Sequence, residues 1–189
     1  MIMENDKVTD CTAHIVTFVV SLFNLIFFIT MIELGCGDRV VTFLNFKAYL
    51  ARLSVDENCK LDYTTIVQCP VQVTIEPSRS SSMKHLKDGL CNGLGKQSRE
   101  LPFESESLEK FKRLFPIGSL EQNEKIIFTK RNDELCLKAR NKECGCVKDK
   151  WLATAFMNLY FNEKHTVVPK AQQMAKAKYS DLQANVVSK

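Results

Sequence analysis

The spacing of apolar residues predicts a compact β–β–α unit between Lys125 and Phe161. Ile126–Phe128 is a short apolar run typical of a strand, and Leu135–Leu137 predicts a second strand after a polar turn. Further on, apolar residues recur every three or four positions, which predicts a helix over Lys148–Asn162. We expect Trp151, Ala155 and Leu159 on its apolar face to pack on Ile127 and Leu135.

The pattern upstream of this unit changes several times. Val67–Ile75 alternates between apolar and polar residues, which predicts a half-buried strand, and Pro70 favours an edge position. Arg39–Ser54 has partly helical spacing and favours a short surface helix. Ser105–Phe115 fits either a helix or a strand. The Cys144–Gly145–Cys146 triplet is interpreted as part of a loop.

An uncharged run, Ile15–Ile32, is close to the ~20 residues that a membrane-spanning helix needs. It predicts a cleaved signal peptide with Gly35–Gly37 as the cleavage region, and a retained anchor or a buried helix are the alternatives. We therefore divide the chain into a leader, an extension with one strand, a core and a basic flexible tail. These predicted segments are residues 1–37, 38–82, 83–163 and 164–189.

Composition places the chain in an oxidising compartment. Eight cysteines are many for a cytosolic chain of 189 residues, and an apolar leader precedes most of them. Cys59 and Cys69 are expected to form a bridge with each other or with other cysteines. Cys144 and Cys146 are expected to pair with distant partners, because a bond between them would close a small strained ring. The sequence does not fix the pairing.

The order of elements from Cys91 to Phe161 resembles the C-terminal half of a chemokine. Ile126–Lys130 is similar to the chemokine strand with the pattern V-I-F-x-T-K, Cys136 stands where the third strand ends, and Trp151 opens the closing helix. Leu101–Pro102 looks like the pair that follows the chemokine N-loop. Cys91 stands before it without a Cys-Cys or Cys-x-Cys partner, as in lymphotactin-like C chemokines.

The resemblance implies an α+β fold in which a small three-stranded antiparallel sheet carries one C-terminal amphipathic helix. The leader and an extra strand-containing segment would precede this core. The resemblance also implies a Cys91–Cys136 disulfide and a seven-helix membrane receptor as partner. The implied receptor-binding residues are Cys91, Asn92, Arg99, Leu101 and Phe103.

A net charge of +4 is mildly basic, and several cations fall on the turns and loops of the predicted core. Cations gathered on one edge attract polyanions. For a secreted chain the corresponding polyanion is glycosaminoglycan, which the chemokine resemblance also implies. The candidate glycosaminoglycan-binding residues are Lys130, Arg131, Lys138, Arg140, Lys142 and Lys148.

No catalytic, metal or cofactor motif is present in the sequence, so we expect neither an enzyme nor a cofactor. The leading hypothesis is a secreted chemokine-like signalling protein. The first alternative is a disulfide-stapled β-rich binding or inhibitory domain, with Val67–Ile75 in the same sheet as Ile126–Leu137. The second is a single-span membrane subunit anchored through Ile15–Ile32. Nucleic acid is not expected as a partner.

Overall fold

A computed structural model describes residues 30–41, 46–164 and 166–187 of the chain. The predicted leader lies mostly outside these ranges, but Met31 and Ile32 at the end of its apolar run belong to the first strand. The predicted cleavage region Gly35–Gly37 also lies inside that strand. No helix within the described ranges is long and apolar enough to cross a bilayer. The residues from Met31 onward form one compact unit.

Six strands form one sheet in the order β1-β2-β3-β6-β7-β8, and every neighbouring pair is antiparallel. Two very short strands, β4 and β5, pair separately. The strands of the large sheet are β1 Met31–Val41, β2 Phe46–Asp56, β3 Val71–Pro77, β6 Ile126–Arg131, β7 Glu134–Ala139 and β8 Lys142–Lys148, and the small pair is β4 Ser81–Ser82 and β5 Ser119–Leu120.

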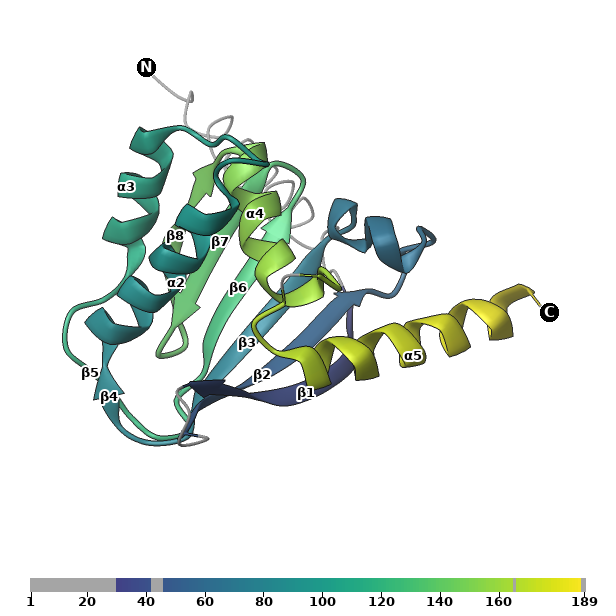
Figure 1. The fold of residues 1–189 in the computed structure, drawn as a ribbon, viewed down its shortest axis with the longest axis horizontal. Helices are drawn as coiled ribbons and strands as arrows, with labels where there is room; N and C mark the ends of the chain where they lie inside the picture. Colours follow the sequence, from purple (N-terminus) through teal and green to yellow (C-terminus); the bar gives the residue numbers. More distant parts are fainter. Residues whose placement is uncertain (1–29, 42–45, 165, 188–189) are drawn as a thin grey trace, which may run out of the picture. The chain divides into compact units, whose positions relative to one another are not determined.

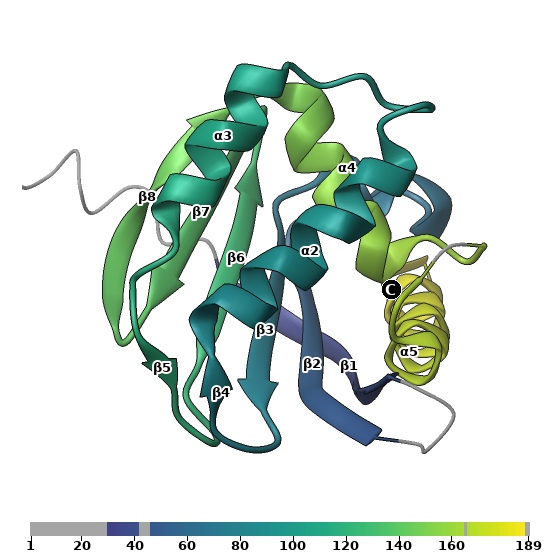
Figure 2. The same cartoon turned by 60° about the vertical axis from the view of Figure 1, so that its left-hand side comes forward.

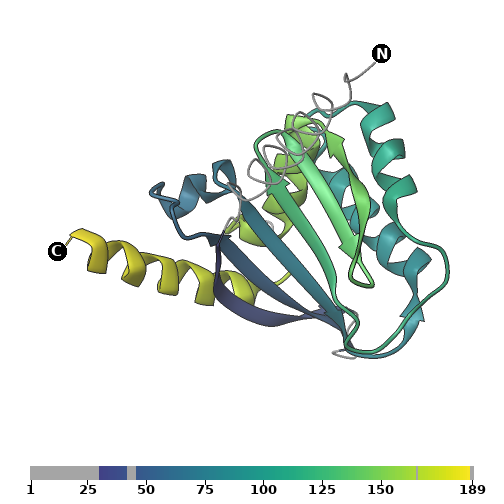
Figure 3. The same ribbon diagram turned by 180° about the vertical axis from the view of Figure 1, so that it is seen from behind.

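Three helices lie over one face of the large sheet, and a fourth runs along β1 (Figure 1). The three are α2 Met83–Gln97, α3 Ser105–Leu114 and α4 Lys150–Phe161, and the fourth is α5 Pro169–Val187. A short 3₁₀ helix, η1 Tyr63–Gln68, precedes β3. Figure 2 shows α2, α3 and α4 as a layer in front of the strands. Figure 3 shows the opposite face, where none of the described helices lies over the sheet.

Side-chain caps fix where two of these helices begin. The Ser82 hydroxyl accepts a hydrogen bond from the backbone N–H of Lys84, which starts α2 directly after β4. The Asp149 carboxylate accepts from the N–H groups of Trp151 and Leu152, both at 2.9 Å, which starts α4 directly after β8. Such caps satisfy N–H groups that have no partner inside the helix.

The core lies between the helix layer and the sheet. Alternation along each strand directs every second side chain to this face, for example Val71, Val73 and Ile75 of β3. Phe128 of β6 joins Phe111 of α3 and Phe156 of α4 in an aromatic cluster, and the ring centroids of Phe128 and Phe156 are 4.5 Å apart. This cluster holds α3 and α4 on the strands.

The predicted three-stranded sheet with one closing helix is wrong. The segment interpreted as an extension supplies β2, β3 and the end of β1, so it belongs to the same sheet as the predicted core. In the region predicted as a short helix, Arg39–Ser54, the described residues belong to β1 and β2, because the ladder between these strands pairs their backbone. The predicted flexible tail forms α5, whose inner residues Ala171 and Ala175 are fully buried.

Other elements agree with the sequence. The strands predicted at Ile126–Phe128 and Leu135–Leu137 are β6 and β7, and the helix predicted over Lys148–Asn162 is α4. Trp151 does not pack as expected, because 45% of it is exposed, and Phe156 of the same helix takes the central place in the core.

Helix α5 lies so close to β1 that no side chain fits between them. A Cβ atom added to Gly37 would lie 2.7 Å from the backbone nitrogen of Ala171, and one added to Gly35 would lie 2.8 Å from the Ala171 carbonyl oxygen. Real Cβ atoms do not approach backbone atoms so closely. The two glycines therefore allow α5 to rest directly on the strand, a use of glycine typical of close backbone approach.

We predict that Gly37→Ala lowers the free energy of unfolding by about 1–3 kcal/mol, because the added methyl group forces α5 away from β1. The matched control is Gly95→Ala in α2, where an added Cβ meets nothing within 4 Å. That substitution should stabilise the protein by about 0.5–1 kcal/mol through helix propensity. Urea unfolding of both variants checks this prediction, and equal stability of the two would contradict it.

Candidate functional site

A cavity of about 290 Å³ lies between α2 and the part of the sheet where β1 and β3 end and β2 begins. We call it the main cavity. Its wall is mostly apolar, with polar groups from β1, β2 and the start of α2. The lining residues are Arg39, Ala48, Tyr49, Ile75, Pro77, Arg79, Ser81, His85, Leu86, Gly89, Leu90, Gly93, Leu120, Leu159 and Val167.

Strand pairing places a cation on the inner face of the sheet. Arg39 lies directly opposite Tyr49 in the β1–β2 ladder. It follows Gly35 and Gly37 at every second position, so its side chain emerges on the face that α5 and α2 cover. One guanidinium nitrogen, Nη1, donates a 2.9 Å hydrogen bond to the carbonyl of Val167 in the α4–α5 linker.

Arg39 forms no ion pair within the described part of the chain. Other arginines do: Arg52 is paired with Glu76 at 3.0 Å and Arg140 with Glu124 at 3.1 Å. Because one bond to Val167 engages only one N–H group, most of the guanidinium donors of Arg39 remain available. A half-buried cation against an apolar wall is best stabilised by an anion.

Two tyrosines stand beside this cation. The hydroxyl oxygens of Tyr49 and Tyr160 are 3.3 Å apart, and either group can be the donor. Burial raises the pKa of Tyr49, and the hydrogen bond with Tyr160 and the charge of Arg39 oppose this only in part. Burial likewise raises the pKa of Tyr160. Both hydroxyls therefore stay protonated at neutral pH. When Tyr160 donates to Tyr49, the O–H of Tyr49, which lines the main cavity, can donate to an anionic group.

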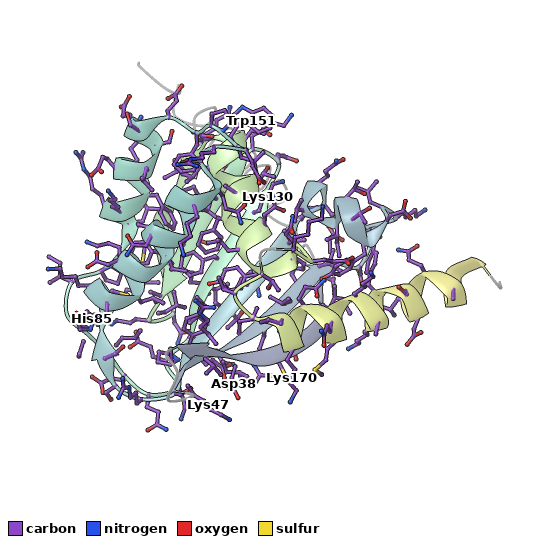
Figure 4. All side chains as sticks on the ribbon, viewed as in Figure 1. Asp38, Lys47, His85, Lys130, Trp151 and Lys170 are labelled. Atoms are coloured by element: carbon purple, nitrogen blue, oxygen red, sulfur yellow. A yellow bond between two sulfur atoms is a disulfide. The ribbon has the colours of Figure 1, made fainter. Side chains whose placement is uncertain are left out.

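Aliphatic side chains form the rest of the wall. Leu86 and Leu90 of α2 face Ile75 of β3, and Leu120 and Leu159 extend the apolar surface. Ile75, Leu90, Leu120 and Leu159 are buried, so the wall belongs to the core of the protein. His85 is exposed, and Figure 4 shows it near the N-terminal end of α2. The main cavity thus combines a long apolar surface with one unpaired cation.

A second hollow of about 450 Å³, which we call the groove, continues from the main cavity between α2 and the α4–α5 linker. Arg39, Gly89, Gly93, Leu159 and Val167 line both spaces. The residues that line only the groove are polar: Asn92, Lys96, Gln97, Glu100 and Thr166. The two spaces therefore meet at Arg39. The main cavity on one side of it has a mostly apolar wall, and the groove on the other side has a polar wall.

The cysteine pairing implied by the chemokine resemblance is wrong. Cys136 is bonded to Cys146 across β7 and β8, and Cys91 is a free thiol in the middle of α2. Cys59 is bonded to Cys69. Cys144 is also a free thiol, and its triplet with Gly145 and Cys146 lies in β8 and forms no loop. The group Glu134, Cys136 and Cys146 has metal-ligand spacing, but the disulfide occupies both sulfur atoms.

The predicted receptor-binding residues are divided between a helix and the connection that follows it. Cys91 and Asn92 lie within α2, and Arg99, Leu101 and Phe103 lie in the connection from α2 to α3. Leu101 and Phe103 are partly buried against the core. Of this set, only Asn92 lines one of the two spaces described above.

The predicted glycosaminoglycan-binding residues do not form a single basic face. Lys130 is 4% exposed, because it follows Ile126 and Phe128 on the inner side of β6, and burial lowers the pKa of its amine. Figure 4 labels its side chain. Arg140 is engaged by Glu124 and by the Ser119 carbonyl. The others, Arg131, Lys138, Lys142 and Lys148, are exposed.

The chain belongs to the chalcone isomerase-like family, whose model matches residues 61–175. The main cavity draws most of its apolar wall from this range, whereas Arg39 and Tyr49 precede it. A solved structure of a fatty-acid binding protein from Arabidopsis thaliana has a similar fold, with a TM-score of 0.68 and 16% sequence identity. That match covers 82% of this chain and 90% of the plant protein. No curated protein sequence matches the chain.

These findings correct the chemokine-like interpretation. A chalcone isomerase-like fold with a six-stranded sheet replaces it, and the expected seven-helix receptor and glycosaminoglycan partners have no support. At 16% identity the plant structure establishes the fold alone. The sequence did not reveal Arg39 and Tyr49 as site residues, because both fall in the region predicted as a short surface helix. The strand that carries Arg39 has glycines where an inner face usually has apolar residues.

Proposed function

We propose that the protein binds a fatty acid, with the carboxylate at Arg39 and the hydrocarbon chain in the main cavity. The observation that carries this proposal is the unpaired guanidinium of Arg39 at the edge of an apolar cavity. The two oxygens of a carboxylate can accept two parallel hydrogen bonds from the N–H groups of a guanidinium. The similar fold of the plant fatty-acid binding protein also supports the proposal.

The tyrosine pair completes the polar end of this site. If Tyr160 donates to Tyr49, the proton of Tyr49 is directed to the bound carboxylate. Arg39 is held in place by Val167, so the cation does not need to reorganise when the ligand enters. Each methylene of the ligand that is buried against the wall contributes about 0.8 kcal/mol. A chain with an acidic end is therefore favoured over a small acid.

We propose binding without turnover, and the expectation that the chain is not an enzyme remains a prediction. The family name includes an isomerase, so the fold is compatible with catalysis. Arg39, Tyr49 and Tyr160 are hydrogen-bond donors in the protonation states described above. Among the described residues that line the main cavity, His85 has the side chain best suited to accept a proton, and it is exposed.

We predict that Arg39→Gln lowers the affinity for palmitic acid about tenfold to hundredfold, since a hydrogen bond to a charged group contributes about 1.5–3 kcal/mol. Displacement of a fluorescent fatty acid from the full chain measures this affinity. Methyl palmitate, which has the same chain without the negative charge, should lose much less affinity in the variant.

The matched control is Arg113→Gln on α3, which removes an exposed arginine that lines neither the main cavity nor the groove. This control should bind palmitic acid as the unchanged protein does. The proposal is overturned if Arg39→Gln binds palmitic acid with unchanged affinity, or if the unchanged protein does not bind it.

We also propose that the chain is secreted, with single-pass membrane attachment as the alternative. The Cys59–Cys69 and Cys136–Cys146 disulfides support an oxidising compartment. Expression in cultured secretory cells, followed by thiol alkylation and mass mapping, tests this. We expect the protein in the medium with both disulfides formed. A cytosolic protein with these four cysteines reduced would contradict the proposal.

A further inference from the structure

The groove offers a place for a second part of the ligand. It meets the main cavity at Arg39, where the proposed function places the carboxyl group of an acyl chain. The hydrocarbon chain would extend from this point along Leu86 and Leu90. Any group attached to the carboxyl carbon would point in the other direction, into the groove. The chemistry of the groove therefore determines which head group the site can accept.

Gln97 provides an unused hydrogen-bonding group in the groove. It is 7% exposed at the last turn of α2, yet its side chain forms no hydrogen bond with the described residues. Its amide atoms remain accessible, because among the described residues Gln172 Nε2 is the one fully buried side-chain polar atom without a partner. Gln97 lines the groove, so a ligand there can accept from its amide nitrogen and donate to its amide oxygen.

The charges around the groove favour a neutral head group. Lys96 and Glu100, one cation and one carboxylate, both line it, so their fields oppose each other. Asn92 adds a second neutral amide on the same side of α2. A hydroxyl-bearing head can use the amides of Asn92 and Gln97.

Gly89 leaves the passage between the two spaces open. It lines both of them, and an added Cβ would meet nothing within 4 Å. A larger residue at Gly89 would project into the junction without a clash with the protein.

We infer that the groove is a head-group subsite, so that the protein accepts acyl chains whose carboxyl group is esterified to a neutral polyhydroxyl head, as in a monoacylglycerol. This inference rests on the proposed function, because the acyl chain must lie in the main cavity. Arg39 donates to the ester carbonyl, and the hydroxyl groups of the head bind Gln97 and Asn92. Gly89 lets the head pass into the groove.

The test compares monopalmitoylglycerol, methyl palmitate and palmitic acid as competitors of a fluorescent fatty acid on the full chain. The two esters place the same group at Arg39 and differ only in the head. Monopalmitoylglycerol should bind more tightly than methyl palmitate. Gln97→Leu should weaken monopalmitoylglycerol about threefold to tenfold, the range expected for lost neutral hydrogen bonds, and leave the other two ligands unchanged.

A second pair of variants tests the passage. Gly89→Leu should weaken monopalmitoylglycerol more than methyl palmitate, because the added side chain fills the junction. Gly95→Leu is the matched control on the same helix, where an added Cβ also meets nothing within 4 Å but lines neither space. It should leave all three affinities unchanged.

The outcomes separate this inference from the proposed function. Palmitic acid that binds through Arg39, together with monopalmitoylglycerol that binds no better than methyl palmitate, would overturn the head-group subsite alone. Equal weakening of all three ligands by Gln97→Leu would also overturn it. Failure of all three ligands to bind would overturn both.

Discussion

The direct contact between α5 and β1 is the constraint on which the rest of the site depends. Gly35 and Gly37 present no side chain to the helix, so the backbone of α5 rests on the strand at Ala171. That contact fixes the linker before α5 and brings the carbonyl of Val167 to Arg39. The next inward position of β1 after the two glycines is Arg39 itself. One strand therefore carries both the surface that receives the helix and the cation that the linker orients.

The energetic character of the site follows from this arrangement. A largely apolar sheet face holds the Arg39 cation at its edge, beside a pair of protonated tyrosines. Desolvation of the Arg39 guanidinium costs free energy when no counter-ion is present, and the described residues supply no counter-ion. The fold thus maintains an unfavourable charge at the boundary between an apolar cavity and a polar groove. A ligand with one apolar end and one oxygen-bearing end satisfies both surfaces at once.

The sequence predicted those elements whose inner face is strongly apolar. Ile126–Arg131, Glu134–Ala139 and Lys150–Phe161 are close to their predicted ranges for this reason. Strand β1 was missed because its inner positions are Gly35, Gly37 and Arg39, and α5 was missed because its buried side is built from small residues such as Ala171 and Ala175. In both cases the elements pack through their backbones and small residues, so their sequences lack the periodic large apolar residues from which strands and helices are predicted.

The chemokine resemblance failed for a related reason. A strand, a turn, a second strand and a helix are local features that many folds share, and their order does not reveal how many further strands join the sheet. The pairing of Val73 with Phe128 joins segments far apart in the sequence and continues the sheet toward β1. Lys130 could have been placed from the sequence, because it continues the alternation of Ile126 and Phe128 on the buried side of its strand.

The carboxyl carbon of the ligand provides the most direct test of the central claim. Palmitic acid labelled with ¹³C at this carbon can be titrated with acid by NMR while bound to the full chain. An ion pair with Arg39 predicts that the bound carboxyl group stays ionised to a lower pH than the same acid in phospholipid vesicles, because the neighbouring cation favours the charged form. A bound carboxyl that titrates as it does in vesicles would contradict the assignment of Arg39 as the anion-binding residue.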